Sequence, residues 1–574
     1  MRNKQGVRHL AGFFRKSTIW TTLMLFFATL AVILAIIGWS LHEECLSISE
    51  ILYRSFVSLL LSGIYEKGSD WNHSAFIDAA RWCALVFFVI GATKAIRSIA
   101  LANFLRWKAR TRSHHVIVVG DNPLAQLIAA ELGKNRRDVT WLGAPKDFNI
   151  LSSSNILAFS DPWSLDTALS FGIKNADSLV IVSSDDAQSV TIAKQVRGLI
   201  PEEKDLSIFV SVDDQWLATR IDELDGITGI HMFSRARAAV RRVNRRHPPF
   251  LIADKLKQEK VHVVIMGYGL YGEALLVDVV LSCLNTKQGK PLVTIVDPDA
   301  ERIENTLRFR YPEMSKSVDI HFCDKALDED FHSLSTEELD QIAACAPVTA
   351  TYIGCRNETR ALNAALALQA YALRSGWGEG PIITRDSDQK TLLEIDAGVS
   401  HLKASQLIGF ADLEGVAHEI GILESGVDSL ARANHEAYRR KAEKNSPANV
   451  PWEKLTENMR NSNRCIVMHI AAKLYSANFG GLEDWILELD DRATNESLPY
   501  FPELQNDQDM ILQIAKLEHE RWMAEKRING YCLGERDDLK RFHPDLVPFD
   551  SLNDRSKSYD VALIDDFARL LARE

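Results

Sequence analysis

An uncharged apolar run near the start of the chain most constrains how the chain can fold. The run extends from Ile19 to Trp39, 21 residues without a charged side chain, and a helix needs about 20 apolar residues to cross the hydrocarbon core of a bilayer. A cleaved signal peptide would have a shorter apolar region, of about 7 to 15 residues, followed by a small-residue cleavage site. This run closes instead with bulky residues and Trp39. We therefore expect a retained transmembrane helix.

A second apolar segment is shorter, because only the 12 residues from Trp82 to Thr93 are free of charge. Extended to residues 76–100, it takes in charged side chains at both ends, where long side chains can reach the membrane interface. Basic residues precede the first run and follow the second, which by the positive-inside rule places both chain ends in the cytoplasm. We expect two transmembrane helices, at about 19–40 and 76–100, in the cell inner (plasma) membrane, with membrane lipid as a partner.

A third apolar stretch, at about 48–66, is too short and too interrupted to span. Non-helical backbone at membrane depth is tolerated only where protein buries it or where it lines a water-filled cavity. The order of segments resembles the two-helix pore-loop cation channels, with Ser62, Gly63, Ile64 and Tyr65 at the filter position. These residues depart from the Thr-Val-Gly-Tyr-Gly filter of potassium channels, so potassium selectivity is not supported. Gly91 is a candidate hinge for a gate, or an ordinary glycine of a membrane helix.

The residues after about 112 are enough for roughly three domains of ordinary size. The formal net charge is −11, and basic residues cluster only beside the membrane segments and at 235–246, so nucleic acid is not an expected partner. The 235–246 run could contact phosphate groups or anionic lipid, but we favour a solvated helix face or a domain linker. Eight cysteines are scattered without a Cys-x-x-Cys pair, which argues against a zinc ribbon or a disulfide framework.

The first soluble segment, 113–248, opens as a degenerate dinucleotide fold. A buried-type strand reaches Gly120, but Asn122 and Ala125 occupy the second and third glycine positions of the loop, so tight NAD binding is not expected here. A strand then ends in Asp161, and a Gly-Ile-x-x-Ala-Asp sequence leads into another strand. This pattern resembles the regulator-of-potassium-conductance (RCK) family, also called TrkA-N.

The second segment, 249–405, repeats the plan with a complete glycine loop. The glycines allow a tight turn and close approach of a pyrophosphate, and an acidic residue after the next strand can bind ribose hydroxyls. We expect NAD or another adenine nucleotide as a regulatory ligand, or else a structural relic of such a loop. The candidate residues are Gly267, Tyr268, Gly269, Leu270, Tyr271, Gly272, Asp297 and Asp324.

The last segment, 406–574, contains two similar stretches. Each has His-Glu-x-aromatic, at His435 and His519, followed by Val-Pro-aromatic-x-x-Leu. The pattern resembles the RyR domain, the tandem repeat of ryanodine receptors. We expect either a cleft that stacks a base, or buried histidines that satisfy backbone groups within each repeat. The spacing excludes His-Glu-x-x-His, and no metal site is expected. The candidate ligand residues are His435, Tyr438, Trp452, His519, Trp522, Arg527, Tyr531 and Arg536.

The expected fold is multidomain: an α-helical transmembrane hairpin with a re-entrant pore loop (1–112), two α/β Rossmann-like (RCK) domains and a mainly α RyR-like domain. No catalytic constellation is recognisable, so an enzyme is not expected. The resemblances imply a homotetrameric ligand-gated cation channel whose RCK ring and RyR domains sense a nucleotide or nucleotide-derived messenger, and a bacterial stress or antiphage effector as its role. The alternative is a non-conducting membrane-anchored nucleotide sensor or a regulatory subunit of an ion transporter.

Overall fold

The structure is a computed structural model. It describes residues 3–41, 46–59, 75–145, 155–183, 185–201, 206–225, 230–326, 334–355, 357–375, 377–386, 406–411, 415–416, 426–441, 448–480 and 507–571. The chain divides into two compact units, one of residues 1–115 and 136–176, the other of residues 116–135 and 177–574.

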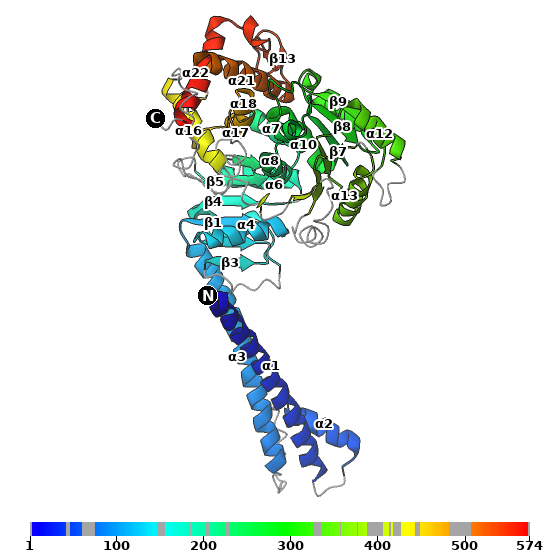
Figure 1. Cartoon of the computed structure of the whole chain (residues 1–574). Helices are drawn as coiled ribbons and strands as arrows, with labels where there is room; N and C mark the ends of the chain where they lie inside the picture. Colours follow the sequence, from blue (N-terminus) through cyan, green and yellow to red (C-terminus); the bar gives the residue numbers. More distant parts are fainter. Residues whose placement is uncertain are drawn as a thin grey trace. The chain divides into compact units, whose positions relative to one another are not determined.

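The first unit begins with two long helices, α1 (Asn3–Ser40) and α3 (Ala75–Thr111), which lie side by side (Figure 1). They approach closely at Gly38, where an added Cβ would lie 2.5 Å from the Ile77 side chain. Two windows, Thr21–Ser40 and Ala75–Ile96, are long and apolar enough to cross a membrane, and only 17% and 22% of them is buried. The expected helical hairpin is therefore present, and low burial distinguishes both helices from the core helices of a water-soluble protein.

Helix α2 (Ile48–Leu59) occupies the first part of the expected pore loop. Its Arg54 pairs with Glu50 (Nε to Oε1, 2.6 Å), and the guanidinium lies 5.3 Å from the centroid of the Trp39 ring of α1. The predicted filter residues 62–65 lie outside the described residues. Helix α3 runs without interruption through Gly91, which faces the Met24 sulfur.

The C-terminal end of α3 is anchored within the same unit. Arg112, almost fully buried, donates to the carbonyl oxygens of Val139 (2.9 Å) and Asn155 (3.1 Å) and pairs with Asp138 (3.3 Å). Arg106 donates to Asp161 (2.9 Å). Arg112 therefore ties α3 to the residues that begin strands β2 and β3, and Arg106 ties it to the residues that follow β3.

The first sheet has six strands in the order β3-β2-β1-β4-β5-β6, and β2 with β3, β4 with β5 and β5 with β6 pair in parallel. The strands consist largely of buried apolar residues, as expected where helices cover both faces of a sheet. The strands are β1 (His115–Val119), β2 (Val139–Leu142), β3 (Ile156–Phe159), β4 (Ala176–Ile181), β5 (Ser207–Ser211) and β6 (Ile230–Phe233). The helices are α4 (Pro123–Lys134), α5 (Leu165–Ser170), η2 (Ile173–Asn175), α6 (Asp186–Leu199), α7 (Gln215–Asp225), α8 (Arg235–Arg246) and α9 (Pro249–Lys255).

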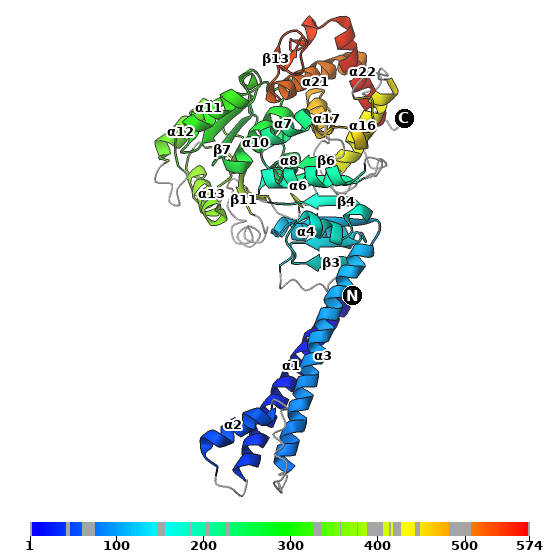
Figure 2. The same ribbon diagram turned by 180° about the vertical axis from the view of Figure 1, so that it is seen from behind.

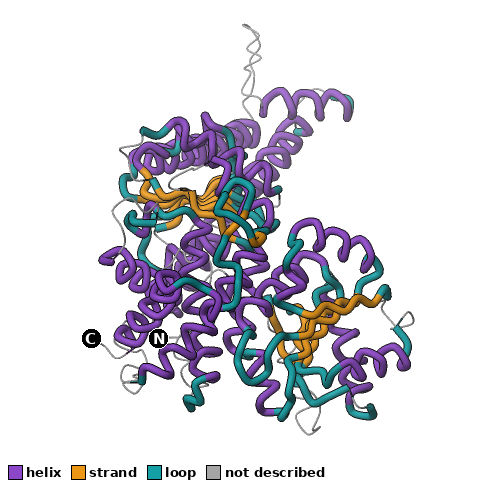
Figure 3. The backbone as a smooth tube through the Cα atoms, turned by 90° about the horizontal axis from the view of Figure 1, so that it is seen from above, coloured by secondary structure: helices purple, strands orange, loops and turns teal. Residues whose placement is uncertain are grey.

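The second sheet is parallel, with the order β12-β11-β10-β7-β8-β9. Figure 3 shows the strands of each sheet flanked by helices. The strands are β7 (His262–Met266), β8 (Leu292–Val296), β9 (Asp319–Cys323), β10 (Ala350–Ile353), β11 (Ile382–Arg385) and β12 (Leu407–Phe410). The helices are α10 (Gly269–Ser282), α11 (Ala300–Arg310), η3 (Met314–Lys316), α12 (Thr336–Cys345) and α13 (Glu358–Ala372). Because β12 pairs with β11, this sheet extends past the expected boundary at residue 405.

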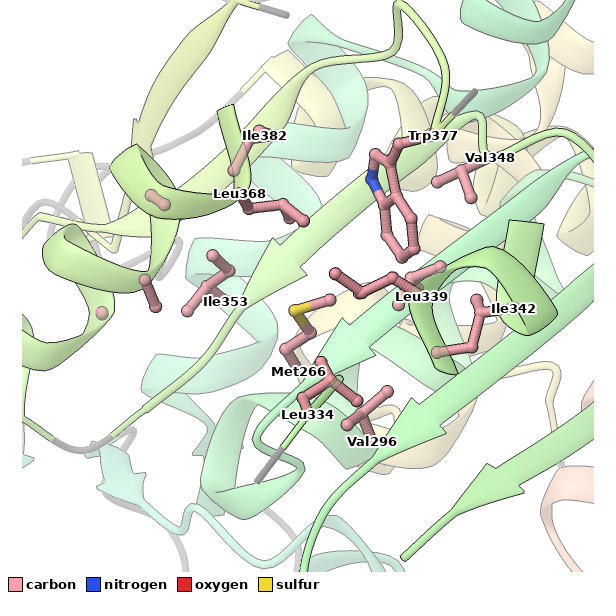
Figure 4. Packing of buried hydrophobic residues seen from close by; sticks show 14 residues of the cluster. Met266, Val296, Leu334, Leu339, Ile342, Val348, Ile353, Leu368, Trp377 and Ile382 are labelled. Carbon is pink, nitrogen blue, oxygen red and sulfur yellow. The ribbon is translucent and has the colours of Figure 1, made fainter. Parts of the chain in front are cut away.

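The core of the second domain lies between its sheet and helices α12 and α13. Met266 and Val296 from the strands meet Leu339 of α12 and Leu368 of α13, and Trp377 closes the cluster (Figure 4). Helix α10 lies on the other face (Figure 2) and contacts α8, α17 and α21. The two α/β sheets are Rossmann-like, as expected for the two central domains.

The C-terminal part is mainly helical, as expected, and forms part of the second unit. Helix α16 contacts α17 and α22, and α21 contacts α22, α18 and α10. The elements are α16 (Gly426–Lys441), η4 (Trp452–Lys454), α17 (Glu457–Met468), α18 (Ile470–Ser476), α21 (Gln508–Ile528), β13 (Cys532–Leu533), β14 (Phe542–His543), η6 (Phe549–Ser551) and α22 (Asp554–Leu571).

A buried ion network joins α18 to α21. Glu518 accepts from Lys473 (2.6 Å) and from Arg521 (2.9 Å), and Arg521 also donates to Glu525 (2.5 Å). All four side chains are at most 9% exposed. Burial alone would raise the pKa of Glu518, but Arg521 and Lys473 lower it to about 2. The carboxylate therefore stays charged, and removing either cation would leave buried charge uncompensated.

Replacing Arg521 with Met should destabilise the protein by about 3–5 kcal/mol, because two buried carboxylates would lose their shared cation. The control is Arg536→Met, whose side chain is 68% exposed and pairs only loosely with Asp538. The control should change stability by less than about 0.5 kcal/mol. Thermal denaturation of the purified full chain would measure both, and equal effects of the two substitutions would contradict the role of the network.

Acidification should destabilise the protein through His469. Burial lowers the pKa of His469 to about 3, and its Nε2 lies 2.7 Å from the Leu284 carbonyl oxygen. In the unfolded chain, the pKa of this histidine is near 6.5. The folded state therefore has its full stability above pH 6.5, where His469 is neutral in both states, and loses about 4 kcal/mol as pH falls toward 3. His469→Gln retains a donor but cannot be protonated. Its melting temperature should fall less than that of the natural protein between pH 6.5 and 4, and parallel curves would contradict the assignment.

Candidate functional site

The glycine loop of the second domain connects β7 to α10. Gly267 and Gly269 have positive φ values of +80° and +35°, and a Cβ on Gly267 would lie 3.3 Å from the Cys355 nitrogen. A Cβ on Gly272 would lie 2.7 Å from the Tyr268 ring. The first two positions therefore need glycine for backbone conformation, and Gly272 lets the Tyr268 ring fold under the first turn of α10.

The first turn of α10 has no side-chain cap. Tyr268, at the N-cap position, makes no side-chain hydrogen bond to the helix. The first amide N–H groups of a helix have no partner within the helix and carry its positive dipole end. Gly269 and Leu270, at the start of this turn, are exposed. The turn can therefore accept an anionic group such as a phosphate from solvent.

Asp297 lies beside this loop at the end of β8. Its Oδ2 accepts the backbone N–H of Tyr268 (2.8 Å), and its Oδ1 accepts that of Asp299 (3.0 Å). A carboxylate can accept about four hydrogen bonds, so Asp297 retains capacity for a hydroxyl ligand. Asp324, also predicted, is exposed after β9, which lies two strands from β7. The structure thus brings Asp297 to the loop and leaves Asp324 further along the sheet edge.

The glycine loop lies where the strand order reverses, because β7 is flanked by β8 on one side and by β10 on the other. Ligands of doubly wound sheets bind in the crevice at such a point. A Cβ on Gly354, after β10, would lie 2.8 Å from the Gly267 oxygen, so the two loops touch. Tyr271 turns toward Phe410 (ring centroids 5.4 Å apart), and Arg385 lies 5.6 Å from the Tyr271 ring centroid.

Three residues near the loop were not predicted from the sequence. Glu273 follows the last glycine and accepts from Arg310 (3.1 Å) and from the Tyr311 hydroxyl. Burial raises the pKa of Tyr311 beyond its usual range, so its hydroxyl remains a donor. The position of Glu273 next to Gly272 was a signal that could have been used. Arg310 and Tyr311 are distant in sequence and carry no motif.

The loop of the first domain differs. A Cβ on Gly120 would lie 2.2 Å from the Val182 carbonyl oxygen, so the turn is pressed against β4. The Asn122 side chain accepts from the Ala125 N–H (2.9 Å) and donates to the Val182 oxygen (3.0 Å). Helix α4 is therefore capped by its own chain where a phosphate would bind.

The two repeat histidines are buried. His435 Nε2 lies 2.8 Å from the Val450 oxygen, and His519 Nε2 lies 2.8 Å from the Val547 oxygen. His519 Nδ1 also lies 3.0 Å from Asp560. Burial alone would lower the pKa of His519, but Asp560 and the carbonyl raise it. Both histidines thus satisfy a backbone group of the Val-Pro turn, the second of the two roles considered from the sequence, and their ligand role stays a prediction without support from this geometry.

The other predicted ligand residues are dispersed. Trp452 is buried, whereas Tyr438 is 37% exposed. Trp522 stacks on His519 (5.4 Å between centroids). Arg527 donates to Ser317 of the second domain (3.1 Å). Tyr531 lies under Lys526, and Arg536 is exposed. Within the described residues, no three metal-ligating side chains form a cluster.

The RyR domain family matches residues 503–573, in agreement with the second of the two expected repeats. The comparison with curated proteins found no matching relative. Among solved structures, GsuK bound to ADP is 13% identical, with a TM-score of 0.35 and coverage of 71% of this chain and 97% of that one. The GsuK channel bound to NAD is 13% identical, with a TM-score of 0.35 and coverage of 72% and 82%. The GsuK RCK domain is 11% identical, with a TM-score of 0.35 and coverage of 55% and 76%.

Proposed function

We propose that the chain is a subunit of a homotetrameric, ligand-gated cation channel of the plasma membrane, and that an adenine nucleotide bound at the 267–272 loop regulates it. The observation that carries the proposal is the uncapped first turn of α10 beside Asp297 at the reversal point of the second sheet. Catalysis has no part in this proposal.

The helical hairpin supports the membrane step. Its large apolar side chains are exposed along both helices, including Leu25 (61%), Phe26 (58%), Trp82 (68%) and Val89 (55%). Exposed apolar surface of this extent is rare on water-soluble monomers. Lipid, or neighbouring subunits in a tetramer, would cover it.

The nucleotide step rests on charge and space. The N-terminus of α10 would bind the phosphates, and the Asp297 carboxylate would accept hydrogen bonds from the ribose hydroxyls. Around Gly269 a Cβ would meet no atom closer than the Gly354 oxygen, at 4.0 Å. A ligand can therefore approach the backbone there. Such a ligand shifts the gate only if it binds the conducting and closed states with different affinity.

The coupling step rests on α3. This helix is continuous over 37 residues from the hairpin to Thr111. Its end is fixed by Arg112 to the carbonyls that precede or begin β2 and β3. A displacement of these strands would then move the proposed second transmembrane helix as a rigid rod.

The first test is current through the purified channel in planar bilayers, under potassium and sodium gradients, with and without ADP or NAD. Gly269→Asp should weaken nucleotide binding at least about tenfold, since a carboxylate would repel phosphate at the helix N-terminus. The control is Gly289→Asp, which also has a positive φ and open space around its Cβ position. Equal binding by both variants would refute the site. Nucleotide binding without any current would favour the non-conducting sensor.

The second test concerns coupling. Arg112→Gln should preserve nucleotide affinity but reduce the ligand-dependent change in current several-fold, because the end of α3 would lose its ion pair with Asp138 and its guanidinium contacts to two carbonyl groups. Arg110→Gln, an exposed position on the same turn, is the matched control and should behave like the natural protein. The same recordings, paired with equilibrium binding, measure both quantities. An Arg112 variant that gates normally would show that α3 is not the connection.

A further inference from the structure

A cavity separate from the glycine loop lies within the second unit, where its three parts meet. Its walls come from α7 and β6 of the first domain, from α11 of the second, and from α17 and α21 of the C-terminal helices. It encloses about 880 Å³ of space not filled by atoms, part of which is open to solvent. None of the residues predicted as ligand contacts lines it.

Positive charge dominates the walls. Four arginines line the cavity, Arg220, Arg237, Arg310 and Arg541, against two acids, Glu457 and Glu525. Both acids already pair with arginines outside the lining. Glu457 Oε1 lies 2.5 Å from Arg464, and Glu525 Oε2 lies 2.5 Å from Arg521. Glu457 and Glu525 are therefore engaged by arginines that do not line the cavity.

The arginines that line the cavity differ in the hydrogen bonds and ion pairs that their side chains make. Arg310 is fixed by Asp214 (3.0 Å) and Glu273 (3.1 Å), and Arg541 donates to the Asn529 oxygen. Among the described residues, half-buried Arg237 makes no side-chain hydrogen bond or close ion pair, and its charge interacts with that of Asp278. A guanidinium carries five donors, and withdrawing them from water without a partner is unfavourable. The cavity thus contains an arginine whose donors are available to a ligand.

An aromatic ring lies among these cations. The guanidinium carbons of Arg220 and Arg310 lie 5.2 and 5.5 Å from the centroid of the Trp216 ring. Contact with an aromatic ring holds a guanidinium plane in place. Planar guanidinium groups in fixed positions bind phosphate oxygens in pairs, which is the preferred arginine–phosphate geometry.

We propose that this cavity binds a small phosphate-bearing ligand, with Arg237 as its principal contact and Arg220, Arg310 and Arg541 as supporting cations. The site does not depend on the nucleotide loop or on conduction. Because its walls come from three parts of the chain, a ligand here would hold the C-terminal helices against α7 and α11. Arg310 also contacts Glu273, next to the glycine loop, so occupancy of the cavity would bear on that loop.

Hydrogen exchange of the full chain in detergent, with and without pyrophosphate or ADP, tests the proposal. We expect slower exchange in peptides from α7 and α17 with at least one probe. Protection by both would identify the phosphates as the recognised group, whereas protection by ADP alone would show that the nucleoside contributes. Protection of these peptides by neither probe would overturn the proposal.

Variants locate the effect. Arg237→Gln should raise the probe concentration for half-maximal protection at least tenfold, whereas Arg242→Gln, on the same helix but outside the lining, should leave it unchanged. Equal effects of the two would also overturn the proposal. Exchange in α13 without ligand reports whether each variant is folded. In Gly269→Asp the protection of α7 and α17 should persist, while protection of residues 267–273 is lost, so failure at one site is distinguishable from failure at the other.

Discussion

The buried carboxylate of Glu518, held between Lys473 and Arg521, determines how the C-terminal helices meet the rest of their unit. It fixes α18 against α21, and on that support His469 reaches the carbonyl of Leu284, just past α10. Ser476 accepts from the Thr286 N–H nearby. Helices α17 and α21 also contact α10 of the second domain, and both helices supply walls of the arginine-lined cavity. The buried ion network of Lys473, Glu518 and Arg521 thus lies close to the place where the C-terminal helices meet the second domain.

Helix α8 shows what composition alone leaves open. Its six arginines within 235–246 were interpreted as a solvated face or a linker. In the structure the helix lies against α10, and its alanines and valines are buried. Asn244 donates to Asp278 of α10 (2.6 Å) and accepts from the Tyr352 hydroxyl. The run belongs to a helix that joins the two α/β domains, and Arg237 faces the cavity between them. The number of charged residues in a segment does not show which residues of another domain the segment will contact.

Local patterns predicted much of the rest, for local reasons. The second strand–glycine loop–helix unit was predictable because a positive φ at Gly267 and a close contact with the Tyr268 ring at Gly272 favour glycine at those positions. The helical hairpin followed from apolar length. The pairing of β12 with the second sheet was missed because a four-residue strand has little pattern of its own. The choice between ligand and structural roles for His435 and His519 depended on carbonyl groups 15 and 28 residues away. Contacts of that kind are fixed by tertiary structure, which the spacing of a motif does not specify.

The two α/β domains differ at the turn that precedes the first helix of each. In the first domain, Asn122 caps the helix where a phosphate would bind, and Asp161, after β3, pairs with Arg106 of α3. One position that a dinucleotide fold gives to its ligand is therefore used for an internal contact, and an acidic residue further along the sheet edge pairs with the helix that leaves the hairpin. In the second domain, the corresponding loop is uncapped, and Asp297 retains acceptor capacity. If a nucleotide binds at the 267–272 loop, as proposed, Asn122 still caps α4 and Asp161 still pairs with Arg106, so these contacts of the first domain do not compete with the ligand.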